Sequence, residues 1–390
     1  MPNHFFVFGI ARSGTNLLAR MIDRHPSAVC ALDPLLPYFK SLRNSIIRDG
    51  ASEQAGRLFS PTAPFQDNYF LSYGPEILDL LLDSDGNLNL PERVQIDLRA
   101  AIVDRAVLES PGLAESLGLA SGGAYGTFLD DVLRIVGQSK SGTVWSGTKE
   151  VWVIDFLPLL SRMYPEARFF LIERDPRAIV ASLLAMAEKD ASQAAHFISY
   201  ARHWRKTVTL SRKFESTLSL RERIQIVSYE RLVRNPEEVA REACAHLGLE
   251  YRPEMLEVSA SGWAGNSSYG DNLGIYGQST ERWRDSLSEA NAQAVEFLCA
   301  PEMMMTAYRP CSQKLGKLTA EIESVFRTVG KSQASWRSDS GHVSLDVGGE
   351  LLRYEMLSSG EKFQEAAVRE CFLDNAIFGA IRAKWQERPI

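Results

Sequence analysis

The sequence lacks a run of apolar residues long enough to cross a bilayer. A membrane-spanning helix needs about 20 predominantly apolar residues, whereas the longest apolar runs here cover only residues 5–11 and 151–160, and Asp155 interrupts the second. The first run has no basic flank and leads directly into a glycine turn, which is not typical of a secretory signal peptide. These absences predict a soluble, cytoplasmic protein without a transmembrane segment.

An excess of basic residues and a regular set of metal-ligating residues are also missing. The net charge of −6 and the pI of about 5.7 argue against a protein that coats nucleic acid, because contact with phosphates needs a basic face. The five cysteines are scattered without a C-x-x-C pair, and the six histidines form no H-E-x-x-H motif. We therefore expect reduced thiols, no metal site and no nucleic-acid partner. The oligomeric state stays open.

Short apolar runs alternate with amphipathic stretches along much of the chain. Apolar strands that alternate with helices indicate a parallel sheet covered on both faces. The sequence therefore predicts an α/β fold of three layers with a central parallel sheet. Strands are expected at residues 5–8, 143–148, 168–173 and 223–228, and helices at residues 17–24, 155–164, 176–188, 194–215 and 236–247. The cations of the fourth helix are expected to form a solvated face: Arg202, Arg205, Lys206, Arg212 and Lys213.

Two segments depart from this alternation. Residues 40–141 have helical character and contribute no obvious strand, so they predict a helical insertion. The segment 312–390 predicts a small C-terminal extension made of a helix, a hairpin around Gly348-Gly349 and a final helix at 360–385. The main domain is then expected to cover residues 1–311.

A glycine-bearing loop joins the first predicted strand to the first helix. Gly9 and Gly14 have the G-x-x-x-x-G spacing of a phosphate-binding loop, in which backbone N–H groups and the helix dipole form an anion cradle. Thr15 and Asn16 stand where a nucleoside triphosphatase has Lys and Ser or Thr. The loop therefore fits a phosphate but not the hydrolysis of a magnesium-bound triphosphate. An ordinary strand-to-helix turn is the alternative.

A second motif follows the strand at 168–173. Asp175 is placed to cap the next helix, and Pro176 stands at its first position. Ligands of open α/β sheets bind outside the carboxyl ends of the strands. Arg174 and the glycine-bearing loop can therefore address one anionic ligand, although an Arg–Asp ion pair at the helix start is the simpler alternative.

Four segments, in order, resemble the sulfotransferases that use 3′-phosphoadenosine-5′-phosphosulfate (PAPS). Residues 11–18 resemble their 5′-phosphosulfate loop, residues 174–182 their 3′-phosphate motif, residues 229–236 the segment beside the adenine, and residues 279–284 a late S-x-x-R-W segment. The resemblance implies a P-loop-like fold, PAPS as sulfuryl donor and adenosine 3′,5′-bisphosphate as product. It implies that the donor is bound by Arg12, Ser13, Gly14, Thr15, Asn16, Leu17, Arg174, Ser182, Tyr229, Ser279 and Arg282. Ala11 and Asn16 depart from the family pattern.

The same resemblance assigns residues to sulfuryl transfer. This reaction needs a protein that holds the donor, neutralises the charge on the leaving phosphate and removes the acceptor's proton. The resemblance places Arg12 around the leaving phosphate and Lys149, at a strand end, near the bridging oxygen. The nearest likeness is to the bacterial and tyrosylprotein sulfotransferases, in which an acidic residue follows the loop helix, an H-P pair and a short strand. The matching residue is Asp33, one methylene shorter than the family's Glu.

Alternatives stay open at several points. Glu150 and His25 are rival bases, although Glu150 can be the ion-pair partner of Lys149 and His25 a capping or packing residue. The predicted function is transfer of a sulfuryl group to a hydroxyl or amine of a small molecule or glycan, with the insertion over the acceptor. A P-loop kinase, which would need Lys directly after Gly14, and a catalytically idle nucleotide-binding protein are the other hypotheses.

Overall fold

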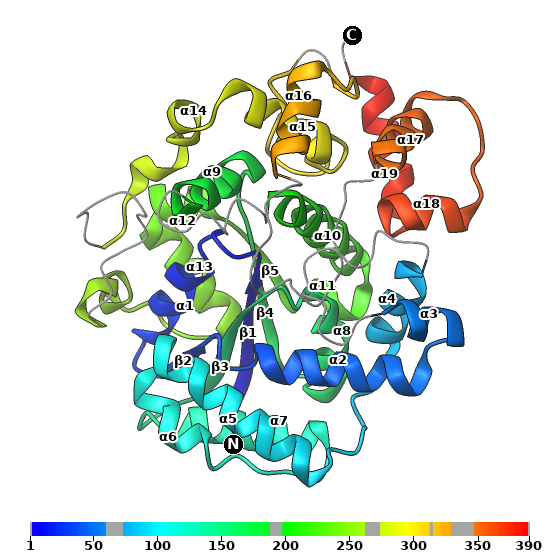
Figure 1. Ribbon diagram of the computed structural model, residues 1–390. Helices are drawn as coiled ribbons and strands as arrows, with labels where there is room; N and C mark the ends of the chain where they lie inside the picture. The colour runs from blue at the N-terminus through cyan, green and yellow to red at the C-terminus, as the bar shows by residue number, and fades with distance from the viewer. Residues whose placement is uncertain are drawn as a thin grey trace. The chain divides into compact units, whose positions relative to one another are not determined.

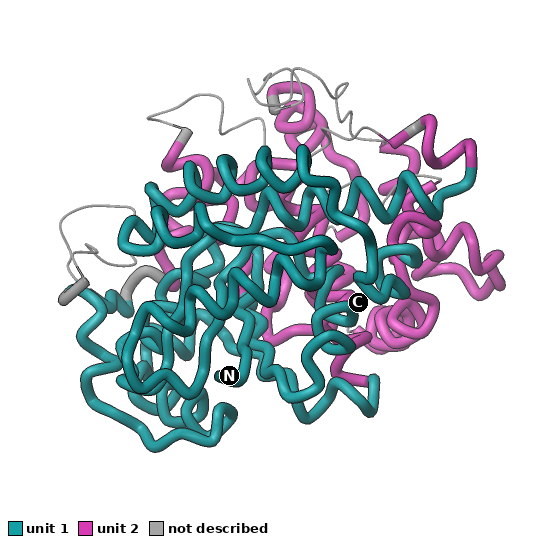
Figure 2. The backbone as a smooth tube through the Cα atoms, turned by 90° about the horizontal axis from the view of Figure 1, so that it is seen from below, with its two compact units in different colours: residues 1–52, 79–173, 217–279 teal, residues 53–78, 174–216, 280–390 magenta. Residues whose placement is uncertain are grey.

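The computed structural model describes residues 2–59, 73–187, 197–261, 274–312, 315–329 and 347–388. The chain divides into two compact units, drawn in teal and magenta in Figure 2. Unit 1 comprises residues 1–52, 79–173 and 217–279, and unit 2 comprises residues 53–78, 174–216 and 280–390. Within the ranges described, no helix is both long and apolar enough to span a membrane.

A five-stranded parallel sheet forms the centre of unit 1 (Figure 1). The strand order is β2-β3-β1-β4-β5, which confirms the predicted central parallel sheet. The strands are β1 (Asn3–Gly9), β2 (Ala28–Leu32), β3 (Trp145–Val151), β4 (Arg168–Glu173) and β5 (Ile224–Ser228). β3 continues past the predicted end at residue 148, because it pairs with β1 as far as the partners Gly9 and Val151. Lys149 is therefore inside the strand rather than after it.

The helices of unit 1 confirm the predicted elements around this sheet. Residues 40–141 contribute helices and, where they are described, no strand of the sheet. The helices that lie in unit 1 are α1 (Thr15–Asp23), α2 (Leu36–Gly50), α5 (Glu92–Glu109), α6 (Ala114–Leu117), α7 (Tyr125–Gln138), α8 (Leu157–Met163), α11 (Leu218–Arg221), α12 (Tyr229–Arg234) and α13 (Pro236–Leu247). α5 packs on β2 and on α2, so part of the insertion reaches the sheet.

Alternate residues of β1 enter the two layers that cover the sheet, as the twofold period of a strand requires. Phe5 and Val7 belong to a core cluster with residues of α1 and α13. On the opposite face, the rings of Phe6 and Phe8 stack with Phe169, and α7 packs on β2 and β3. The sheet thus has helices on both faces, which is the predicted three-layer arrangement.

Unit 2 is helical, and α10 packs against three of its other helices, α9, α15 and α19. The extension 312–390 belongs to this unit. The helices are α3 (Glu53–Leu58), α9 (Pro176–Ala187), α10 (Phe197–Ser216), α14 (Trp283–Ser286), α15 (Glu289–Met303), α16 (Ala320–Val329), α17 (Val347–Ser358), α18 (Glu365–Phe372) and α19 (Asn375–Glu387), while α4 (Gly74–Asp83) crosses from unit 2 into unit 1. The boundary expected at residue 311 stays a prediction.

Three of the five cations of α10 are buried instead of forming a solvated face, contrary to the sequence prediction. Arg202, Arg205 and Lys206 are at most 5% exposed. Arg205 Nη1 donates a hydrogen bond of 2.8 Å to Glu350 Oε1, and Arg202 Nε lies 3.6 Å from the same carboxylate oxygen. The prediction was wrong because α17 supplies a buried carboxylate from a distant part of the chain, and local periodicity carries no signal of such a partner.

The hairpin predicted around Gly348-Gly349 is also wrong, because α17 contains both glycines. Glu350 and Arg353, one helical turn apart, form a buried ion pair of 3.0 Å. The final helix at 360–385 is broken into α18 and α19. Leu373 has a φ of 66°, in the left-handed region that ends helices, and Asp374 then caps α19 by accepting hydrogen bonds from two backbone N–H groups.

Candidate active site

The loop between β1 and α1 has the geometry of an anion cradle. Gly14, with a φ of 100°, caps α1 without a side chain, so the N–H groups of the first helical turn have no capping side chain. Ser13 is fully buried, and its Oγ makes no hydrogen bond to any part of the chain that the structure describes. Asn16 Oδ1 is also buried and accepts no hydrogen bond from the described residues. Because buried polar atoms normally have partners, these groups point to a polar ligand.

Glycine is required at both ends of this loop. A β-carbon at Gly9 would lie 2.7 Å from Thr15 Cγ2 and 2.8 Å from Ser13 Oγ. A β-carbon at Gly14 would overlap the ring of Tyr229, the first residue of α12. The structure therefore brings the third predicted motif directly against the first.

Asp33, directly after β2, and Lys149, inside the neighbouring strand β3, form a buried ion pair near the carboxyl edge of the sheet. Lys149 Nζ donates to Asp33 Oδ2, and the two residues are 2% and 7% exposed. Asp33 Oδ1 is buried and accepts no hydrogen bond from the described residues. The structure thus joins the predicted base to the predicted cation. It also shows that the sequence-based alternative, in which Glu150 pairs with Lys149, is wrong.

Both rival bases have other tasks in the structure. Glu150 Oε1 accepts a hydrogen bond of 2.7 Å from the backbone N–H of Leu35. Burial, together with the negative charge of Asp33, raises the pKa of Glu150 well above its ordinary value. His25 Nδ1 accepts from Ser27 N over 3.0 Å, so its Nε2–H donates to Glu250 O over 2.9 Å. Each of the two rival bases therefore already holds a backbone group in the fold.

Unfavourable backbone conformations gather at the same edge of the sheet. Arg12, Asp33 and Trp152 have φ angles of 71°, 51° and 74°. They follow β1, β2 and β3, which are neighbours in the sheet. Non-glycine residues are held in the left-handed region mainly where the surrounding structure enforces it, and such residues cluster at functional sites. This edge is therefore the candidate active site of unit 1.

The predicted 3′-phosphate motif lies in unit 2. Arg177 N donates to Asp175 Oδ1 over 2.8 Å, which confirms the predicted cap of α9. The helix-start ion pair considered from the sequence is made by Arg177, which lies 2.7 Å from Asp175 and 2.7 Å from Glu296. Arg174 and Ser182 are buried, and Trp204 Nε1 donates to the carbonyl of Arg174 over 2.9 Å.

Trp283 of the late S-x-x-R-W segment contacts this motif within unit 2. The guanidinium of Arg177 lies over the ring of Trp283, 4.2 Å from its centroid. Arg282 directly precedes α14, whereas the side chain of Ser279 lies outside the described residues. Sequence reasoning missed Glu296. This residue accepts a hydrogen bond from Arg177, but it is 119 positions away in the chain and belongs to no motif.

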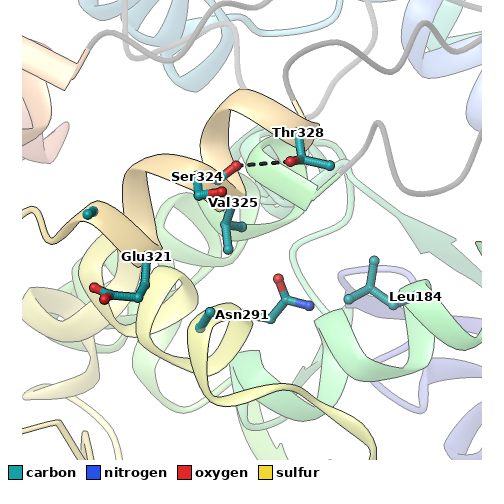
Figure 3. A pocket seen from close by; sticks show the side chains of 8 residues that line it. Leu184, Asn291, Glu321, Ser324, Val325 and Thr328 are labelled. Carbon is teal, nitrogen blue, oxygen red and sulfur yellow. Dashed lines mark hydrogen bonds between the residues drawn. The ribbon is translucent and has the colours of Figure 1, made fainter.

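Unit 2 also contains a cavity of about 630 Å³ (Figure 3). Its lining comes from α9, the start of α15 and α16. It includes Leu184, two positions beyond Ser182, and Ser324, whose carbonyl accepts the hydroxyl of Thr328. Among the described residues that line this cavity, none is a predicted donor-binding or catalytic residue.

The sequence model of the Sulfotransferase family matches residues 2–253 of this chain. The chain belongs to the sulfotransferase family. A Caenorhabditis briggsae protein with the name "Putative protein-tyrosine sulfotransferase" is 22% identical over 323 residues, which cover 79% of this chain and 90% of that protein. The family match makes this protein a sulfotransferase enzyme.

Solved structures with a similar fold include other sulfotransferases. The sulfotransferase domain of the Synechococcus PCC 7002 olefin synthase is 17% identical to the present chain, with a TM-score of 0.43. The match covers 76% of the present chain and 94% of the Synechococcus chain. A retinol dehydratase solved with androsterone and the inactive cofactor PAP is 15% identical, with a TM-score of 0.38 over 78% of this chain and 82% of that one.

Proposed function

We propose that this sulfotransferase moves a sulfuryl group from PAPS to a hydroxyl or amine of a small molecule or glycan. The observation that carries the proposal is the buried Asp33–Lys149 ion pair, at the edge of the sheet where the anion cradle also lies. PAPS supplies an activated sulfuryl group on a phosphate leaving group. The proposed donor-binding residues are Arg12, Ser13, Gly14, Thr15, Asn16, Leu17, Arg174, Ser182, Tyr229, Ser279 and Arg282.

The residues of the cradle fit a phosphosulfate group. The uncapped start of α1 offers backbone N–H donors, and the buried Ser13 hydroxyl needs a partner. Arg12 adds a fixed positive charge on the same loop. A compact anion with several acceptor oxygens satisfies these groups together, and Thr15 at the position of a kinase's Lys argues against a triphosphate bound with magnesium.

Asp33 is proposed to remove the acceptor's proton. Its Oδ1 has lone pairs that no described residue engages, while Oδ2 is held by Lys149. When Oδ1 takes the proton from the acceptor, Asp33 becomes neutral and its attraction for Lys149 weakens. The Lys149 ammonium is then available to balance the negative charge that grows on the leaving phosphate.

The acceptor class, the cellular setting and the absence of a metal complete the proposal. A phenolic hydroxyl is the first acceptor to test, because the Caenorhabditis briggsae relative is named for protein tyrosine. A reducing, cytoplasmic setting accords with five free cysteines, four of which are buried. We expect no metal in the reaction, since the chemistry is assigned to side chains of the enzyme.

Two measurements test the function. Adenosine 3′,5′-bisphosphate should raise the melting temperature far more than ATP or AMP, because a ligand that binds the folded state stabilises it by mass action. Mass spectrometry should then detect the gain of one sulfuryl group on phenols, amines or glycans incubated with enzyme and PAPS. Equal stabilisation by ATP with Mg²⁺ would support the kinase hypothesis. Binding without transfer to any acceptor would support the idle nucleotide-binding protein.

A further inference from the structure

The insertion helix α5 holds the segment that carries Asp33. Arg105 Nε donates a hydrogen bond of 2.7 Å to the carbonyl of Asp33, and the two residues are 72 positions apart in the chain. Ser110, at the end of the same helix, accepts a hydrogen bond of 2.8 Å from the N–H of Leu32. Two side chains from the end of α5 therefore bind the backbone just where β2 ends.

β3 holds the same segment from its other side. The N–H of Asp33 donates to the carbonyl of Lys149 over 2.7 Å, and the N–H of Leu35 donates to Glu150 Oε1 over 2.7 Å. Between these contacts Asp33 has a φ of 51°, a conformation that a residue with a β-carbon avoids unless its surroundings enforce it. The direction of the Asp33 side chain depends on this backbone conformation.

Arg105 is not needed simply to dock α5. The buried residues of the helix, Leu98, Ile102 and Ala106, recur at four-residue spacing and already form its apolar contact face. The Arg105 hydrogen bond instead ends on the carbonyl group of Asp33, whose carboxylate contacts Lys149. Charge-assisted donors of this kind form the stronger class of protein hydrogen bonds.

We propose that Arg105 is a positioning residue for sulfuryl transfer. It holds the backbone of Asp33 in the left-handed conformation, so that the Asp33 carboxylate stays in contact with Lys149 and its Oδ1 faces the acceptor. The inference rests on the proposed role of Asp33 as base. It gives the insertion a part in catalysis beyond covering the acceptor, because α5 then sets the geometry of the proton transfer.

The test compares Arg105→Met with Arg99→Met, using PAPS with phenol or 4-nitrophenol as the acceptor. Arg99 lies on the same helix and also donates to a backbone carbonyl, that of Ala120, away from Asp33. 4-Nitrophenol ionises readily and needs little help from a base, whereas phenol needs that help. A misplaced base should reduce kcat for phenol by roughly 10–100-fold and affect 4-nitrophenol much less. Arg99→Met should leave the ratio of kcat for phenol to kcat for 4-nitrophenol at the wild-type value. Arg105→Lys should recover part of the kcat for phenol that Arg105→Met loses.

A second readout does not depend on activity. Crystal structures of the wild type and of Arg105→Met, or of Arg105→Lys if Arg105→Met does not fold, should show that Asp33 leaves the left-handed region and loses its contact with Lys149. An unmoved Asp33 together with an unchanged phenol to 4-nitrophenol ratio would overturn the assignment. If the wild type sulfates neither phenol nor any other acceptor, the proposed function fails, and the crystal structures still decide whether Arg105 positions Asp33.

Discussion

The ring of Tyr229 lies so close to Gly14 that a β-carbon at Gly14 would be 2.7 Å from Tyr229 Cε2. Gly14 ends the loop after β1, and Tyr229 follows β5, so the contact bridges two strands that β4 separates in the sheet. The phosphate loop therefore takes its shape from a second motif as well as from its own glycines.

Replacement of Gly14 by Ala is expected to destabilise the protein for two reasons. The φ of 100° is unfavourable for any residue with a β-carbon, by roughly 1–2 kcal/mol. The overlap with Tyr229 adds an overpacking cost of roughly 1–3 kcal/mol. Urea unfolding of Gly14→Ala gives the sum of both effects.

Gly142→Ala is the matched control for that measurement. Gly142 has a φ of 78°, and a β-carbon there would meet no atom within 4 Å, so this variant carries the backbone cost alone. An equal loss of stability in the two variants would mean that the Tyr229 ring moves aside freely.

Arg174→Ala should weaken the binding of adenosine 3′,5′-bisphosphate. If Arg174 contacts the 3′-phosphate, the variant loses a charge-assisted hydrogen bond worth roughly 1.5–3 kcal/mol. Isothermal titration calorimetry measures the change, with the exposed Arg221→Ala as a control for the loss of one positive charge. An unchanged affinity in Arg174→Ala would place the 3′-phosphate elsewhere.

Asp33→Asn should abolish most turnover while bisphosphate binding stays near the wild-type value. The amide keeps the shape of the side chain but has no basic lone pair, and a positioned general base contributes roughly 10²–10⁴-fold to a rate. Asp33→Glu restores the carboxylate at a longer reach and should retain part of the activity. Sulfuryl transfer by Asp33→Asn at near the wild-type rate would show that the base assignment is wrong, and Glu150→Gln and His25→Asn would be assayed next.

Acid should weaken unit 2 through Glu350. Burial alone would raise the pKa of Glu350, but the charges of Arg205, Arg353 and Arg202 lower it to about 2. A carboxyl whose folded pKa is depressed stabilises the fold above its unfolded pKa, and this contribution is lost as pH falls from about 4.5 to about 2. The pKa difference corresponds to roughly 3 kcal/mol.

The variant Glu350→Gln isolates this contribution. At pH 7 it leaves buried guanidinium groups without their carboxylate, which costs roughly 3–5 kcal/mol, and the difference from the wild type should shrink between pH 5 and pH 2. Denaturant unfolding at each pH measures the difference. Glu355→Gln, on the exposed side of the same helix, should show no such trend. A constant difference across this range would contradict the role of Glu350.

Sequence reasoning predicted the elements that local patterns control. The apolar runs of the strands, the loop from Gly9 to Gly14 and the capped start of α9 at Asp175 all depend on residues within a few positions of one another. Apolar periodicity and turn chemistry act over that range, so the sequence carries their signal directly. The family resemblance rested on the same short segments.

Long-range contacts are what the sequence left undecided and the tertiary structure decided. Lys149 and Asp33 are 116 positions apart, and Arg205 and Glu350 are 145 apart. Whether a charged residue lies in solvent or in a buried pair depends on which distant segment the fold brings beside it, and local periodicity is the same in both cases. By itself the sequence determined the parallel sheet and the motif positions. Only the fold decided that Asp33 pairs with Lys149 and that Arg202, Arg205 and Lys206 of α10 are buried, because a buried charge is stable only where tertiary contacts supply its partner.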